Sequence, residues 1–169
     1  MPPQGIKLRK HSEFMSQNEV LEVAGVFVSL GINKIRLTGG EPLVRCDTHE
    51  IIKELSKLPV ELAITTNGVF VHEFIDTFKK AGIHAVNVSL DSLKKERNFS
   101  ISGRDEFERV TKNINLLLKN DFHVKINVVV MKNVNDDEIT DFVEWTKHEP
   151  VHVRFIEFMP FAGNQWSNE

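Results

Sequence analysis

The sequence predicts an α/β fold in which a parallel sheet closes, or partly closes, into a barrel with a polar interior. Segments with helical and with strand periodicity alternate along the chain, which indicates parallel strands joined by crossover connections. Each strand carries apolar residues at one parity and polar residues at the other. A strand covered by helices on both faces would instead be apolar throughout. Several of the polar residues stand near the ends of the strands, where barrels of this kind bind ligands.

The helices and strands are indicated by their periodicity and by the residues at their ends. Ser16 and Glu19 have the spacing of a capping box and begin a helix that ends before Gly31. Asp47 and Glu50 repeat this spacing at the start of the next helix. The expected strands are 34–38, 61–65, 85–90, 123–130 and 151–158, the remaining helices are 71–81, 107–119 and a segment ending near residue 148, and the stretch 97–104 is expected to be irregular.

Length and composition limit the classes of protein. The 169 residues suit a single domain over 1–169. Apolar residues at 41% and charged residues at 27% are typical of a globular protein and exclude a disordered or collagen-like chain. A net charge of −3 disfavours nucleic acid as the partner. No membrane span or secretory signal is visible, so a cytoplasmic location is predicted. Cys46 is the only cysteine, and one thiol cannot form an internal disulfide or ligate a cluster.

Polar residues inside the strands are the main indication of function. Arg36, Lys125 and Asn127 lie within apolar strands rather than at their ends. A charged group in such a position needs a partner or a ligand. In the last strand, Glu157 and Met159 are expected on the polar side. Together these side chains favour a polar cavity that binds a ligand.

Simpler interpretations remain open for several of these residues. Polar residues at strand ends are often only turn residues and helix caps. Lys125 is compatible with a Schiff base, with binding of an anion, or with an ion pair to Asp91 or Glu157. Met159 is equally compatible with ordinary packing.

A glycine-rich loop, Thr38-Gly39-Gly40-Glu41-Pro42, follows the first strand. Adjacent glycines let the backbone approach a ligand closely and adopt positive φ. The Glu41 carboxylate can accept a hydrogen bond from an ammonium group. Neither a P-loop nor a dinucleotide-binding glycine motif is present.

This loop resembles the GGEP motif of radical S-adenosylmethionine (SAM) enzymes. Over essentially its whole length the sequence is similar to one family among them, molybdenum cofactor biosynthesis protein A, the GTP 3′,8-cyclases. The segments that carry this resemblance are 35–45, 65–68, 87–91, 125–129 and 154–160.

The resemblance implies an incomplete (β/α)6 partial TIM-like barrel with five of the six parallel strands present. It also implies S-adenosyl-L-methionine as cofactor and GTP as substrate. In the family a [4Fe-4S] cluster cleaves SAM, and the resulting radical cyclises GTP between C3′ and C8. The resemblance assigns SAM binding to Gly39, Gly40, Glu41, Ser89 and Met159, and GTP binding to Arg36, Thr65 and Lys125.

The chain also departs from the family. The C-x-x-x-C-x-x-C cluster loop, the first barrel strand and the C-terminal region are not found in it, so no catalytic or metal-binding residue is assigned. The isolated chain is therefore expected to be inactive. The partners implied are a second copy in a homodimer or the missing segments of the same enzyme, with cyclic pyranopterin monophosphate synthase as the pathway partner.

Two other classes of protein stay open. One is a non-catalytic α/β module that binds SAM or a nucleotide. The other is an unrelated doubly wound or aldolase-like protein that uses Lys125 to form an imine.

Overall fold

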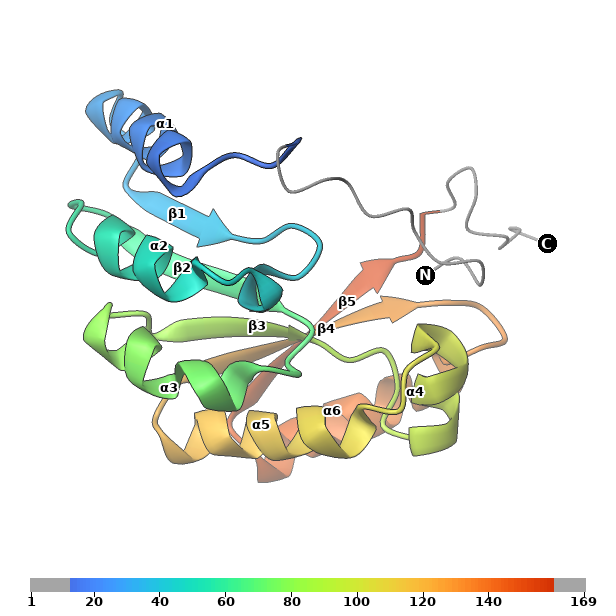
Figure 1. Ribbon diagram of the computed structural model, residues 1–169. Helices are drawn as coiled ribbons and strands as arrows, with labels where there is room; N and C mark the ends of the chain where they lie inside the picture. Colours follow the sequence, from blue (N-terminus) through green and yellow to red (C-terminus); the bar gives the residue numbers. More distant parts are fainter. Residues whose placement is uncertain (1–12, 160–169) are drawn as a thin grey trace.

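The computed structural model describes residues 13–159 and contains one parallel five-stranded sheet with helices packed on it (Figure 1). The strands are β1 (Lys34–Leu37), β2 (Glu61–Thr66), β3 (Ala85–Ser89), β4 (His123–Val130) and β5 (Val151–Glu157). The helices are α1 (Gln17–Ser29), α2 (Thr48–Leu55), α3 (Val71–Lys80), α4 (Lys95–Ser102), α5 (Phe107–Lys119) and α6 (Ile139–His148), with 3₁₀ turns at Pro42–Val44 and Asp136–Glu138.

The strands follow one another in sequence order, β1-β2-β3-β4-β5, and every pair is parallel. A right-handed crossover to the next strand always places its helix on the same face of the sheet. This order confirms the predicted α/β fold of the partial-barrel type. It contradicts the doubly wound alternative, which requires the strand order to reverse and helices to cover both faces.

The core lies between the sheet and this single helical layer. Ile64, Val86 and Ile126 are fully buried on the sheet. Phe78 of α3 and Phe142 of α6 are buried against them from the helices. These strand residues belong to the apolar parity of their strands, so the alternation in the sequence identified the buried face correctly.

The first helix begins as its sequence predicts. Glu19 N–H donates to Ser16 Oγ at 3.3 Å, and Ser16 N–H donates to Glu19 Oε2 at 2.7 Å, which completes the capping box. Asp47 precedes α2 as expected but forms no capping bond, and its carboxylate pairs with the Arg45 guanidinium instead.

One expectation about secondary structure is wrong, because the stretch 97–104 is largely helical. Helix α4 ends at Gly103, which has φ of 69° and whose N–H donates to Phe99 O at 2.8 Å. None of the residues of α4 is buried. The helix therefore has no apolar stripe for a periodicity analysis to detect.

The outer edge of β1 carries apolar surface. Within residues 13–159, β1 pairs only with β2. Helix α1 beside it exposes Val26 (54%), Phe27 (52%) and Leu30 at its end (75%). A cavity of about 380 Å³ lies between α1 and β1. Among residues 13–159, no further strand pairs with this edge of the sheet.

No helix within residues 13–159 is long and apolar enough to cross a membrane.

Gly68, in the turn after β2, occupies a position that no other residue fits well. Its φ is +82°, and a Cβ built on it would lie 2.8 Å from Val88 Cγ1 and 3.1 Å from Val110 Cγ1. Gly82 has a similar φ of +66° with no atom within 4 Å of such a Cβ. Comparing substitutions at the two glycines therefore separates the cost of backbone strain, which both share, from the cost of crowding, which only Gly68 has.

We expect Gly68→Ala to lower the free energy of unfolding by about 2–4 kcal/mol, since positive φ costs about 1 kcal/mol and overpacking adds about 1–3 kcal/mol. Gly82→Ala should lower it by about 1 kcal/mol only. Urea denaturation of both variants measures the two changes in the free energy of unfolding. Equal decreases would contradict the prediction, because they would show that Val88 and Val110 move aside without cost.

Candidate functional site

The face of the sheet opposite the helices is lined by polar side chains. Register partners in a parallel sheet point to the same side. Thr65 pairs with Asn87, and Asn87 pairs with Lys125, so these three residues form one row across β2, β3 and β4. Ser89 pairs with Asn127, and Asn127 pairs with Arg154, which forms a second row nearer the carboxyl ends. With Arg36 of β1, which is aligned with Ala63, these residues make up what we call the polar face.

The polar face brings together all three residues assigned to GTP. Arg36, Thr65 and Lys125 come from three strands and lie on one side of the sheet. The Arg36 guanidinium donates to Ile64 O at a long 3.5 Å. Among residues 13–159, Lys125 forms no ion pair.

The simpler interpretation of Lys125, an ion pair with Asp91 or Glu157, does not hold. Asp91 Oδ1 accepts the Val129 N–H at 2.8 Å. Glu157 is aligned with Val130, which puts it at the parity that faces the helices. The expectation that Glu157 and Met159 continue the polar side is therefore wrong for Glu157.

Arg154 is the polar-face cation that the sequence analysis missed. The expectation that Glu157 lies on the polar side would put Arg154, three residues earlier, on the opposite side. Its register with Asn127 places it on the polar face. The neighbouring residue Phe155 agrees with this register, because its ring meets Phe142 of α6 edge-on at 6.2 Å between ring centroids and so lies on the helical side.

Two buried acceptors on the polar face have no partner among the described residues. They are the Oδ1 atoms of Asn87 and Asn127. Asn87 is only 2% exposed. A buried amide oxygen without a donor costs about 1–3 kcal/mol. The two oxygens are therefore available to accept hydrogen bonds from N–H or O–H groups of a ligand.

The glycine-rich loop after β1 lies at the carboxyl end of this face. Gly39 has φ of +137°, and a Cβ on either Gly39 or Gly40 would meet no atom within 4 Å. The loop therefore offers open backbone to a ligand. Gly39 requires glycine for its conformation.

Glu41 braces this loop against the end of β2. Its Oε1 accepts from Leu43 N at 3.1 Å and from Thr66 Oγ1 at 2.7 Å. Its Oε2 accepts from Asn67 N at 2.6 Å. Three of about four lone-pair sites are thus used within the protein. Glu41 holds the loop, with one acceptor site left for a ligand.

The last two residues assigned to SAM lie at or beyond strand ends. Ser89 closes β3 and is exposed. Met159 follows β5 and is 73% exposed. Within the described residues, neither side chain forms a hydrogen bond to the other site residues.

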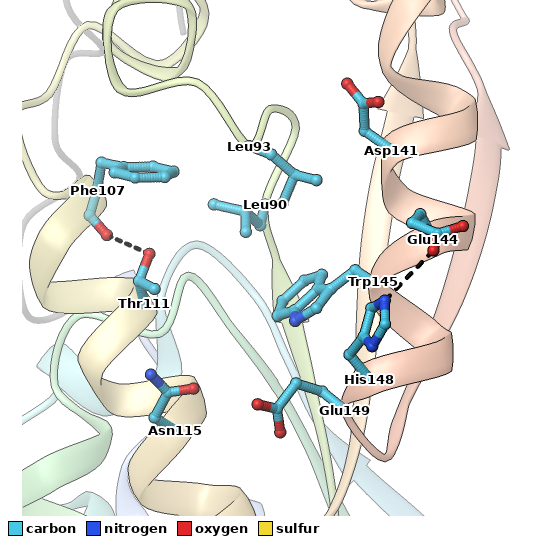
Figure 2. A pocket seen from close by; sticks show the side chains of 10 residues that line it. All are labelled: Leu90, Leu93, Phe107, Thr111, Asn115, Asp141, Glu144, Trp145, His148 and Glu149. Carbon is cyan, nitrogen blue, oxygen red and sulfur yellow. Dashed lines mark hydrogen bonds and ion pairs between the residues drawn. The ribbon is translucent and has the colours of Figure 1, made fainter.

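A separate groove of about 540 Å³ opens in the helical layer between α5 and α6 (Figure 2). Trp145 and His148 of α6 face Thr111 and Asn115 of α5 across it, and the His148 ring pairs with Glu144 at 3.3 Å. Leu90 and Leu93 of the loop after β3 also line the groove, and its other lining residues belong to α5, α6 and the end of α6, on the opposite side of the sheet from the polar face. The groove is not part of the candidate site.

No cluster of His, Cys, Asp and Glu within residues 13–159 could hold a metal ion.

Comparison with known proteins gives one family. The profile of the Radical SAM superfamily matches residues 2–146. The GTP 3′,8-cyclase, mitochondrial, of Arabidopsis thaliana is 46% identical over 170 residues, which are 99% of this chain and 44% of that protein. The GTP 3′,8-cyclase of Petrotoga mobilis is 44% identical over 165 residues, which are 96% of this chain and 51% of that protein. Molybdenum cofactor biosynthesis protein 1 of Drosophila melanogaster is 43% identical, over 100% of this chain and 30% of that protein. The chain thus spans about half, or less, of the length of these relatives.

Solved structures agree on the fold. SuiB from Streptococcus suis, bound to S-adenosylmethionine, matches with a TM-score of 0.78 at 16% identity over 94% of this chain and 37% of that one. Methylornithine synthase matches with a TM-score of 0.75 at 16% identity over 96% and 50%. At such identities the likeness bears on the fold alone.

Asp91 lies two residues beyond the end of β3. Burial of its carboxyl group raises its pKa above the ordinary 3.8, and the hydrogen bond from Val129 N–H offsets only part of this rise. A raised folded-state pKa means that the folded protein binds this proton more tightly than the unfolded chain. The stability contributed by Asp91 is therefore present below pH 3.8 and is lost as the pH rises through the raised pKa.

We expect Asp91→Asn to abolish the loss of stability at rising pH, because an amide oxygen still accepts from Val129 N–H and carries no charge. Urea denaturation over a pH series should show the variant gaining stability relative to the parent as the pH rises above 3.8. Asp76→Asn on the exposed side of α3 controls for removal of a carboxylate. A difference in stability between Asp91→Asn and the parent that does not change with pH would contradict a raised pKa of Asp91.

Proposed function

The chain belongs to the radical SAM superfamily, and from this we propose that it is the SAM- and GTP-binding core of a GTP 3′,8-cyclase of molybdenum cofactor biosynthesis. The names of the relatives that cover nearly the whole chain support this assignment. The site supports it independently, through the composition of the polar face.

The observation that carries the proposal is the combination of three cations and two unpaired acceptors on one face. Arg36, Lys125 and Arg154 provide positive charge without a compensating ion pair within residues 13–159. A triphosphate is the natural counter-charge, because guanidinium and ammonium groups bind phosphate oxygens through charge-assisted hydrogen bonds. The Asn87 and Asn127 oxygens can accept from hydroxyl and amino groups, which nucleosides carry.

SAM fits the other end of this face. In our proposal the open backbone at Gly39 and Gly40 lies against the methionine part of SAM, with Glu41 holding the loop in place. Ser89 is suited to the ribose hydroxyls because it closes β3 beside Asn127. Met159 is kept as an apolar contact to SAM.

Iron–sulfur chemistry is not supplied by the residues of this chain. In the superfamily, SAM and a [4Fe-4S] cluster supply the radical that starts the reaction. Such a cluster needs several thiolate ligands, and this sequence has one cysteine. The described residues also offer no other metal-binding cluster. The part that we assign to this chain is therefore to bind and orient both ligands and to exclude water around them.

Catalytic activity is proposed for a protein that carries this core together with cluster ligands. The isolated chain is proposed to be inactive. The cyclised nucleotide would pass to cyclic pyranopterin monophosphate synthase. A homodimer and a cytoplasmic location are retained as predictions, although one relative is named as mitochondrial.

The function is tested with the longest protein that the gene encodes, purified and reduced without oxygen. We expect conversion of GTP to a 3′,8-cyclised product together with cleavage of SAM. The chain 1–169 alone should bind both ligands by calorimetry and form no product. Binding without turnover by the longest protein would favour the non-catalytic module, and binding of neither ligand would refute both. Borohydride trapping of a carbonyl compound on Lys125 would favour the aldolase-like alternative.

Lys125→Met should weaken GTP binding about tenfold to a hundredfold, because a charge-assisted hydrogen bond contributes about 1.5–3 kcal/mol. SAM binding should stay within about twofold, since SAM has no phosphate. Lys57→Met is the matched control, because Lys57 pairs with Glu54 on the surface at 2.6 Å. Calorimetric titration of each variant gives both dissociation constants. An unchanged GTP affinity would remove Lys125 from the site.

A further inference from the structure

The loops that leave β3 and β4 are joined by a buried polar cluster centred on Glu138. This side chain is completely buried. Its Oε1 accepts from Ser92 Oγ at 2.8 Å and from the Arg97 guanidinium at 2.5 Å. Its Oε2 accepts from Leu93 N at 2.7 Å. One carboxylate thus ties the loop after β3, helix α4 and the 3₁₀ turn after β4.

Asn135 extends the same connection to the ends of the two strands. It is 2% exposed. Its Nδ2 donates to Asp91 O at 2.7 Å and to Val129 O at 2.9 Å. Its Oδ1 accepts from Met131 N at 2.7 Å. Together with the bond from Val129 N to Asp91 Oδ1, these contacts connect β3 and β4 just beyond their last paired residues.

We name Ser92, Arg97, Asn135 and Glu138 the rim clamp. Burying a carboxylate costs several kcal/mol, and apolar residues of similar volume often give equal or greater stability. Stability alone therefore does not explain a buried glutamate here. A fully satisfied polar cluster does specify one geometry, because moving any member leaves a buried group unpaired.

The segment that the clamp holds is continuous with the candidate site. Leu90 N–H donates to Asn127 O at 3.0 Å, and Ser89 immediately precedes it. Ser92 and Leu93, which the Glu138 carboxylate holds, follow within four residues of Ser89. No hydrogen bond or ion pair within residues 13–159 joins the residues assigned to GTP, Arg36, Thr65 and Lys125, to the rim clamp.

We infer that Glu138 and Arg97 are positioning residues, which orient the loop after β3 so that Ser89 and Asn127 meet the SAM ribose. This inference rests on the proposed function. It requires that loosening the clamp weakens SAM binding and leaves the affinity for GTP phosphates at Arg36 and Lys125 unchanged.

The first measurement does not depend on either ligand. Glu138→Gln preserves shape but places an amide donor against Ser92, Leu93 or Arg97, one of which then loses its acceptor. In the longest protein that the gene encodes, amide hydrogen exchange of segment 90–94 should become at least about tenfold faster in this variant. Exchange in β1 and β2 should not change. Unchanged exchange in 90–94, or faster exchange throughout the sheet, overturns the clamp.

The second measurement is calorimetric titration of the same protein with SAM and with GTP. We expect the dissociation constant for SAM to rise about tenfold in Glu138→Gln and in Arg97→Met, with that for GTP within about twofold. Arg97→Lys keeps a cation beside Glu138 and should recover most of the SAM affinity. Glu54→Gln, in a surface pair with Lys57, is the control variant.

The outcomes separate the two claims. Equal losses for SAM and GTP, or no loss for SAM, overturn the positioning role. If the parent protein binds neither ligand, the proposed function fails and the positioning role fails with it, while hydrogen exchange still decides whether the clamp holds the loop.

Discussion

The sequential order of parallel strands is the constraint on which the rest of this structure depends. Because each crossover is right-handed and leads to the adjacent strand, all the crossover helices pack on one face of the sheet. The other face then has no apolar layer to cover it within residues 13–159. Its residues are free to be polar, and Arg36, Asn87, Lys125 and Asn127 show that they are. The candidate site is a direct consequence of this topology.

The carboxyl ends of the strands are fixed by polar groups rather than by packing. Glu41 connects the loop after β1 to the end of β2 through Thr66 and Asn67. Asn135 and Glu138 connect the loops after β3 and β4. Both connections use buried or half-buried acceptors with several donors each. Short backbone loops held in this way can present N–H groups and small side chains to a ligand without reorganisation on binding.

Satisfied and unsatisfied polar atoms divide the sheet into two regions. In the rim clamp the carboxylate of Glu138 and the amide of Asn135 have all their main partners in the protein. On the polar face, Asn87 and Asn127 each retain a buried oxygen without a donor. Buried polar groups are normally hydrogen-bonded, so the first region is satisfied within the protein, whereas the second is where we propose that a ligand binds.

The sequence by itself determined the strands, most of the helices and the polar parity of β1 to β4, because side-chain alternation and capping residues act over a few neighbouring positions. The glycine-rich loop was also predictable from neighbouring residues. The facing of side chains in β5 and the presence of helix α4 were not predictable in this way. Phe155 and Arg154 are assigned to faces only by register with β4, and α4 has no buried stripe. The contact between Ser92 and Glu138 joins residues 46 positions apart. Only the tertiary structure decided such contacts, because hydrogen bonds between distant segments depend on how strands align and leave no periodic pattern in the chain.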